Sequence, residues 1–298
     1  MTSDPHSAAI PVPGTAGGHN KRMLIDEGYC VIRQVVPITL IERLTWVTTG
    51  LAQEQEATNP GRFQSQGSMI GAMAHPLLAE LISLPSAAES VAALGYPSPT
   101  FTDGYIISKP PGCPRLFWHY DWFSWCDPSA WEPEPQQLFL MYYLTDTSVT
   151  NGCLRVIPGS HLSHNPLHEQ LASPHSRQLA EVADERGEAF SDRPDEVDVP
   201  VRAGDLVIGD ARLLHAAHAN ESAERRTVIT LWLQPDFEVL PERIKAQVVR
   251  KTHPVPAWWP SRARTRVEAL HPAWNGTAEP YERTLYIRRP ERVSSDET

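Results

Sequence analysis

The stretch Leu116-Phe117-Trp118-His119-Tyr120-Asp121-Trp122-Phe123-Ser124-Trp125 decides how this 298-residue chain is interpreted. It places a histidine, His119, and a carboxylate, Asp121, two residues apart within a run of aromatic residues. Side chains two residues apart on a β-strand project to the same face, so both groups can bind one ion. The stretch therefore predicts two ligands of a metal site.

A third candidate ligand lies far downstream. His215 ends the apolar segment 204–215, and Arg226 follows eleven residues later. Two imidazoles and one carboxylate, with open positions opposite them, are the ligand set of non-haem Fe(II) oxygenases. A single buried histidine is usually structural, but here two histidines, the chain's only His-x-Asp pair and an arginine occur together. We therefore predict that His119, Asp121 and His215 bind a catalytic metal ion.

Composition excludes several classes of function. The net charge of −10 makes nucleic acid an improbable partner, because no basic field attracts a polyanion. No run of eighteen apolar residues could span a membrane, and the N-terminus lacks the pattern of a secretion signal, so we expect a cytoplasmic protein. The four cysteines lack the C-x-x-C spacing of a zinc knuckle, and their pattern indicates no disulfide framework.

Hydrophobic periodicity predicts one catalytic domain over residues 23–298, preceded by a disordered tail at 1–22. Short strands separated by prolines and glycines dominate, and helices are expected near residues 38–51, 75–83 and 86–94. This pattern is typical of a mainly β fold with flanking helices, the double-stranded β-helix or cupin-like jelly roll. The polar insertion at about 160–198 is interpreted as a lid, and residues 241–298 form an extension of unassigned role.

Three motifs together resemble the phytanoyl-CoA dioxygenase family of Fe(II)- and 2-oxoglutarate-dependent oxygenases. They are the His119-x-Asp121 pair, the segment 151–161 beginning Asn-Gly, and the span from His215 to Arg226. The resemblance extends from about residue 24 to residue 237. It implies a jelly roll that binds Fe(II), uses 2-oxoglutarate and O2 as co-substrates, and acts on a small molecule. It does not indicate an oligomeric state.

The resemblance also assigns roles to single residues. The family has an asparagine five residues and an arginine eleven residues after its distal histidine, which fits His215 with Asn220 and Arg226, and does not fit His218. The planar guanidinium of Arg226 suits the distal carboxylate of 2-oxoglutarate. His218 is then a pocket or loop residue.

Further contacts follow from the same resemblance. Co-substrate contacts are expected from Tyr105 and Ile107, on the strand before the iron-binding one, and from Met141. Substrate contacts are expected from Phe117, Phe123, Trp125 and His218. Of these, Trp125 follows from the resemblance, since it matches an aromatic residue that lines the pocket in related hydroxylases. The alternative for the aromatic residues is that half of them belong to the core, as the alternation of a strand demands. Ala217 departs from the family pattern, which often has a serine there that bonds the co-substrate.

The activity that this resemblance implies is oxidation, by default hydroxylation, of an unactivated C–H bond, with release of succinate and CO2. A tailoring enzyme of secondary metabolism acting on a free metabolite is the preferred interpretation. The alternatives are an oxygenase of an acyl-CoA or carrier-bound substrate, a jelly-roll binding protein without turnover, and a zinc hydrolase with the same triad. Halogenation is disfavoured, because it requires the position of Asp121 for a halide.

Overall fold

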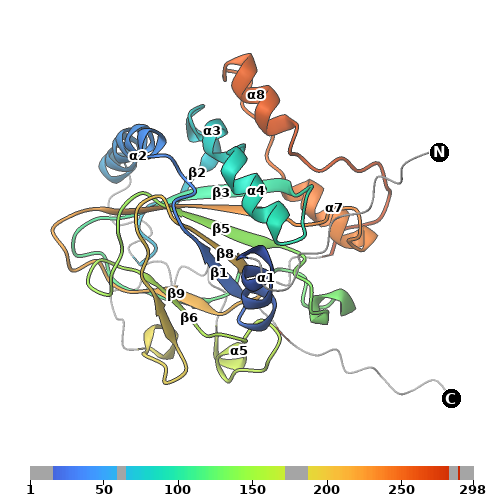
Figure 1. Ribbon diagram of the computed structural model, residues 1–298, viewed down its shortest axis with the longest axis horizontal. Helices are drawn as coiled ribbons and strands as arrows, with labels where there is room; N and C mark the ends of the chain where they lie inside the picture. Colours follow the sequence, from blue (N-terminus) through green and yellow to red (C-terminus); the bar gives the residue numbers. More distant parts are fainter. Residues whose placement is uncertain (1–15, 59–64, 172–186, 282–287, 289–298) are drawn as a thin grey trace.

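Two antiparallel sheets face each other in this chain (Figure 1), as the computed structural model of residues 16–58, 65–171, 187–281 and 288 shows. The larger sheet has the strand order β1-β8-β5-β10-β3-β2, and the smaller has the order β4-β9-β6-β7. This arrangement confirms the predicted jelly roll with flanking helices. The strands are as follows: β1 (Tyr29–Ile32), β2 (Ile70–Gly71), β3 (Thr100–Lys109), β4 (Leu116–His119), β5 (Leu138–Tyr143), β6 (Leu154–Val156), β7 (Val197–Val199), β8 (Leu206–Asp210), β9 (His215–Ala217) and β10 (Arg226–Gln234).

Helices cover the outer face of the larger sheet. In Figure 1, α2, α3, α4 and α8 lie on the side of this sheet that is opposite to β6 and β9. The helices of the described residues are as follows: α1 (Ala16–Asp26), α2 (Ile38–Thr58), α3 (Leu78–Ile82), α4 (Pro85–Ala93), α5 (Leu167–Gln170), α7 (Glu242–Lys251) and α8 (Ser261–Glu268). Short 3-10 turns are η1 (Ala72–Ala74), η2 (Pro128–Trp131) and η3 (Glu188–Phe190).

Strand β5 shows how the two faces of the large sheet differ. All six of its residues are buried. Leu140 and Tyr142 pack in the core beneath the helices, whereas Phe139, Met141 and Tyr143 pack between the two sheets. Burial of each such side chain contributes about 1.5–3 kcal/mol, so both layers hold this strand in register. The inner face of β5 is thereby fixed as one wall of the space between the sheets.

A third core, rich in aromatic residues, lies behind the smaller sheet. Trp118 on β4, and Tyr120 and Trp122 in the turn that follows it, are each about 1% exposed. They pack with Ile244 and Val248 of α7. The C-terminal helix α7 therefore supports the strand that ends at His119.

The N-terminal tail was predicted to be disordered through residue 22, and this is wrong for residues 16–22, which form the first part of α1. Tertiary packing explains the difference. A Cβ built on Gly17 would lie 2.8 Å from the carbonyl oxygen of Ala93, so only a glycine lets α1 approach α4 this closely. Leu24 of the same helix is 1% exposed. Residues 1–15 lie outside the described residues.

The insertion predicted at 160–198 lies partly outside the described residues, at 172–186. Its last part forms η3 and β7, and β7 pairs with β6. In the C-terminal extension, Trp259 is buried, Trp258 is exposed, and the indole of Trp274 donates to Glu242. Within the described part of the chain, no helix is both long and apolar enough to cross a bilayer.

Candidate active site

His119 and Asp121 converge although β4 ends between them. The backbone N–H groups of Asp121 and Trp122 both donate to the carbonyl of Ala211, over 2.7 and 2.8 Å. These bonds turn the chain away from the sheet directly after His119. The turn leaves Nε2 of His119 at 3.8 Å from Oδ1 of Asp121. The two groups lie together as predicted, but through a turn and not through a continuing strand.

His215 faces this pair from the neighbouring strand. Strands β4 and β9 are antiparallel partners, with His119 directly opposite His215. The two imidazole rings have their centroids 4.1 Å apart, and Nε2 of His215 lies 3.8 Å from Oδ2 of Asp121. All three candidate ligand atoms lie within 4.8 Å of one another.

The two imidazoles are oriented by backbone carbonyls. Nδ1 of His119 lies 3.0 Å from the carbonyl oxygen of Phe117, and Nδ1 of His215 lies 2.9 Å from that of Leu213. A carbonyl only accepts, so each Nδ1 carries the proton and the neutral ring offers the lone pair of Nε2. Both lone pairs are thus available beside the carboxylate. A divalent first-row metal fits this donor set.

Two residues of the larger sheet, Trp232 and Phe139, contact the triad. The indole N–H of Trp232 donates to Oδ2 of Asp121 over 2.9 Å. The ring of Phe139 has its centroid 5.0 Å from that of His215. Phe139 in turn lies close against Gly209, where a Cβ would come within 2.1 Å of the phenyl ring.

A cavity of about 500 Å³ opens between the two sheets at the triad. Residues of both sheets, of α2 and of α7 line it: Gln55, Gln66, Met69, Thr102, Asp103, Tyr105, Ile107, Lys109, Leu116, His119, Asp121, Gln137, Met141, Tyr143, Leu154, His215, Ala216, Ala217, Arg226, Val228, Thr230, Trp232 and Lys251. The volume suits a small organic ligand.

Arg226 lies at the end of the cavity that is remote from Trp232 on β10. It is 3% exposed, its Nε has no hydrogen-bond partner, and no described carboxylate forms an ion pair with it. Burial lowers the pKa of the Arg226 guanidinium. Gly152, with φ of +90°, passes close by, since a Cβ there would lie 3.3 Å from Nη2. A buried cation without a counter-charge is costly, so this end is suited to an anion.

The other predicted co-substrate contacts also line this cavity. Tyr105, Ile107 and Met141 project into it from β3 and β5. Tyr105 packs edge-on against Trp232, with ring centroids 5.8 Å apart. Tyr105, Met141 and Thr230 lie directly opposite one another on the three strands.

The predicted substrate contacts lie elsewhere. Phe117, Phe123 and Trp125 are each 0–1% exposed and belong to packed cores, not to the cavity wall. Trp125 packs against Tyr120, because the chain turns after His119 and the period of two does not continue. His218 also faces away, with Nε2 at 2.6 Å from Oδ1 of Asp198. These four residues are therefore placed behind the site.

Sequence reasoning missed several lining residues. Trp232 follows Arg226 by six positions on the same strand, and Asp103 precedes Tyr105 by two, so their shared face was available from strand periodicity. Gln137 and Lys251 gave no such signal, because the packing of distant elements brings them to the cavity.

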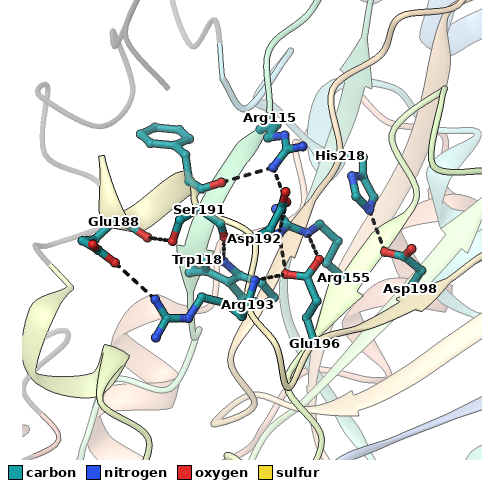
Figure 2. Close-up of polar contacts among 11 residues, drawn as sticks. Arg115, Trp118, Arg155, Glu188, Ser191, Asp192, Arg193, Glu196, Asp198 and His218 are labelled. Carbon is teal, nitrogen blue, oxygen red and sulfur yellow. Dashed lines mark hydrogen bonds and ion pairs between the residues drawn. The ribbon is translucent and has the colours of Figure 1, made fainter. Parts of the chain in front are cut away.

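A polar network fastens the end of the insertion to the outside of the smaller sheet (Figure 2). The guanidinium of Arg155 is 0% exposed and bonds the carbonyl of Ser191 over 3.2 Å, Asp192 over 3.0 Å, and both oxygens of Glu196. The indole of Trp118 donates to the same Ser191 carbonyl over 2.9 Å. The segment 187–199 is therefore held against β4 and β6.

The comparisons with known proteins agree with this geometry. The family model described as Phytanoyl-CoA dioxygenase (PhyH) matches residues 25–228. No curated protein matches the chain.

Solved structures share the fold at low sequence identity. The non-heme alpha ketoglutarate dependent epimerase SnoN from nogalamycin biosynthesis is 20% identical over 74% of this chain and 83% of its own, with a TM-score of 0.53. The carbocyclase SnoK from the same biosynthesis is 23% identical over 78% and 87%, with a TM-score of 0.51. AviO1 from Streptomyces viridochromogenes Tue57 is 20% identical over 75% and 96%, with a TM-score of 0.53.

Proposed function

Because the chain belongs to the phytanoyl-CoA dioxygenase family, we propose that it oxidises an unactivated C–H bond of a small metabolite, by default hydroxylating it. Enzymes of this family depend on Fe(II), 2-oxoglutarate and O2, and this chain is an enzyme of that class. When bound, the iron couples the oxidative decarboxylation of 2-oxoglutarate to succinate and CO2 with oxidation of the substrate.

One observation carries the assignment of the site. Three ligand atoms, from His119, Asp121 and His215, lie within 4.8 Å of one another at a cavity that also contains the unpaired guanidinium of Arg226. In the proposal the two Nε2 atoms and the Asp121 carboxylate hold Fe(II), with the carboxylate offsetting part of its charge.

Arg226 orients the co-substrate in this proposal. Its planar guanidinium binds the distal carboxylate of 2-oxoglutarate through two parallel hydrogen bonds, which would satisfy the unpaired Nε. Tyr105, Ile107 and Met141 form the cavity wall beside the bound co-substrate, between Arg226 and the triad. The hydroxyl of Thr230 is buried without a partner and can donate to a co-substrate oxygen. The apolar remainder of the wall excludes water.

The biological setting is proposed from structural similarity. SnoN is described in complex with Fe3+, alpha ketoglutarate and nogalamycin RO, and SnoK as a carbocyclase of the same biosynthesis. The similarity to these enzymes supports a role in tailoring a secondary metabolite. None of the four cysteines forms a disulfide, which fits the reducing cytoplasm where we place the enzyme.

Succinate formation tests the proposal. Purified protein with Fe(II), 2-oxoglutarate, O2 and a panel of metabolites is expected to form succinate, whereas Asp121→Ala is expected to form none. Asp236→Asn, an exposed carboxylate outside the cavity, serves as the matched control.

Two results would contradict it. Absence of succinate from the wild-type protein with every metabolite would favour a binding protein without turnover. Hydrolysis that proceeds with zinc and without O2 would favour a hydrolase built on the same triad.

A further inference from the structure

The wall formed by β5, β10 and β3 has a chemical polarity along its length. Residues directly opposite one another on antiparallel strands share a face, so the wall consists of rows. Arg226 and Lys109 form the row at one end. Trp232 and Asp103, with Phe139 on β5, form the row at the other end, where Trp232 bonds Asp121. The Asp103 row therefore lies at the metal end of the cavity.

Asp103 offers a carboxylate at this end. Its side chain is 22% exposed and lines the cavity. The adjacent Gly104 N–H donates to Oδ1 over 2.8 Å, and Nδ1 of His253 lies 3.5 Å from the same oxygen. Oδ2 receives no hydrogen bond from the described residues. Burial raises the pKa of the Asp103 carboxyl. This oxygen is suited to a ligand donor such as a hydroxyl or an amine.

Gln137 offers a buried amide beside the metal ligands. It is 4% exposed, lines the cavity, and its side chain makes no hydrogen bond within the described ranges. The backbone carbonyl oxygen of Gln137 accepts from the N–H of Ala211, whose own backbone carbonyl accepts from the N–H of Asp121. The side-chain amide is open to the cavity, so a ligand there can donate to its oxygen and accept from its nitrogen.

Lys251, the last residue of α7, lies at the same end of the cavity. Its Nζ lies 3.8 Å from the ring centroid of Phe123, and its stem lines the cavity. Carboxylate, amide and ammonium thus surround the space beyond the triad. A hydrocarbon chain placed there would remove the Asp103 carboxylate and the Gln137 amide from water without giving them hydrogen bonds.

We propose that Asp103, Gln137 and Lys251 determine specificity, and that the substrate is a compact ring bearing hydroxyl or amine groups, such as a sugar unit, and not an acyl chain. The inference rests on the proposed function, because it takes the Arg226 end as the co-substrate site. Asp103 accepts from a hydroxyl or ammonium of the substrate. The Gln137 amide both donates to and accepts from a neighbouring hydroxyl.

Calorimetry on the metal-free protein tests this with three small ring probes and one acyl thioester. The ring probes are methyl α-glucopyranoside, its 2-amino analogue, and 2-methoxytetrahydropyran, which keeps the ring and lacks hydroxyls. Octanoyl-CoA represents an acyl chain. We expect the two hydroxylated rings to bind more tightly than both other probes by ten-fold or more, as loss of charge-assisted hydrogen bonds implies.

Two variants separate the contacts. Asp103→Asn is expected to weaken binding of the amino probe at least ten-fold more than binding of the neutral glycoside, because the substitution removes the negative charge. Gln137→Leu is expected to weaken binding of both hydroxylated probes. The controls are Gln136→Leu, a buried neighbour that is not on this cavity wall, and the exposed Asp236→Asn, both with wild-type affinities.

Any of three results would overturn the inference: tighter or equal binding of 2-methoxytetrahydropyran or octanoyl-CoA, no binding of either hydroxylated ring, or wild-type affinities in both variants. The wild-type succinate assay distinguishes these from failure of the proposed function. Succinate formation combined with one of these results rejects the specificity assignment alone, whereas no succinate rejects the function and the inference together.

Discussion

The indole N–H of Trp232 donates to Oδ2 of Asp121 over 2.9 Å, and Nε2 of His215 lies 3.8 Å from the same oxygen. The indole of Trp232 therefore fixes the Asp121 carboxylate, which is the one carboxylate of the triad. Replacing Trp232 by Phe keeps most of the volume and removes the donor. We expect metal affinity to fall by about 10–100-fold, the usual effect of losing a partner of a metal ligand. Titration with Co(II) measures it, and unchanged affinity would contradict the role.

Gly209 controls the position of a metal-ligand ring through Phe139. A Cβ at Gly209 would lie 2.1 Å from the phenyl ring, which must then shift, and that ring contacts His215 with centroids 5.0 Å apart. We expect Gly209→Ala to lower Co(II) affinity and to cost about 1–3 kcal/mol of stability through overpacking. The double variant Gly209→Ala with Phe139→Leu makes room and should recover part of the affinity. No recovery would show that the backbone, and not the ring, is disturbed.

Arg226 should have opposite effects on binding and on stability. It is a buried cation without an ion pair among the described residues, so Arg226→Met removes a desolvation cost. We expect the melting temperature to stay or rise while the Kd for 2-oxoglutarate increases at least 100-fold. Arg226→Lys keeps the charge without the two parallel donors, and its affinity should be intermediate. A variant that binds 2-oxoglutarate as the wild type does would exclude Arg226 as the anchor.

The site residues were predicted from short spacing, for His119 and Asp121, and from the family resemblance, for the co-substrate contacts. His119 and Asp121 lie two residues apart, and Tyr105, Ile107 and Arg226 lie on strands whose alternate residues face the cavity. The same periodicity predicts that Trp232 shares a face with Arg226. These positions depend only on local backbone geometry.

The remainder depended on contacts between distant segments. Phe123 and Trp125 were expected at the substrate, but two N–H groups bonded to Ala211 end the strand and send both rings into the core. Lys251 reaches the cavity because α7 packs on that same aromatic core. Gly17 lets α1 form against α4, where composition indicated a tail. No local pattern specifies such pairings.

His168 makes stability depend on pH below neutrality. It is 4% exposed, and burial together with Arg288 lowers its pKa to about 3. Between that value and the ordinary one of about 6.5, the unfolded chain binds a proton that the folded chain excludes, so acid destabilises the fold. We expect the free energy of unfolding to lose up to about 1.4 kcal/mol per pH unit over this range. Urea unfolding at pH 4.5, 5.5 and 7.5 measures the slope. His168→Phe should reduce it, and His19→Phe, at an exposed position of α1, should retain it.

Arg155 holds the segment 187–199 against the smaller sheet, as the polar network of Figure 2 shows. Glu196, only 15% exposed, loses its charged partner in Arg155→Met, and breaking a buried pair in this way costs about 3–5 kcal/mol. We expect a lower melting temperature and new chymotryptic cleavage after Phe190, which is now 3% exposed and packs on Phe117.

Arg193→Met is the matched control for this network, because Arg193 pairs over 3.2 Å with a Glu188 that is 71% exposed. Pairs exposed to solvent contribute about 0–1 kcal/mol, so this variant should unfold and be cleaved as the wild type is. Equal behaviour of the two variants would mean that β7 pairing and the Phe190 contact hold the segment without Arg155. A large loss in Arg155→Met alone, with cleavage confined to 187–199, would instead establish that the buried guanidinium is the fastening point, since the strand pairing is the same in both proteins.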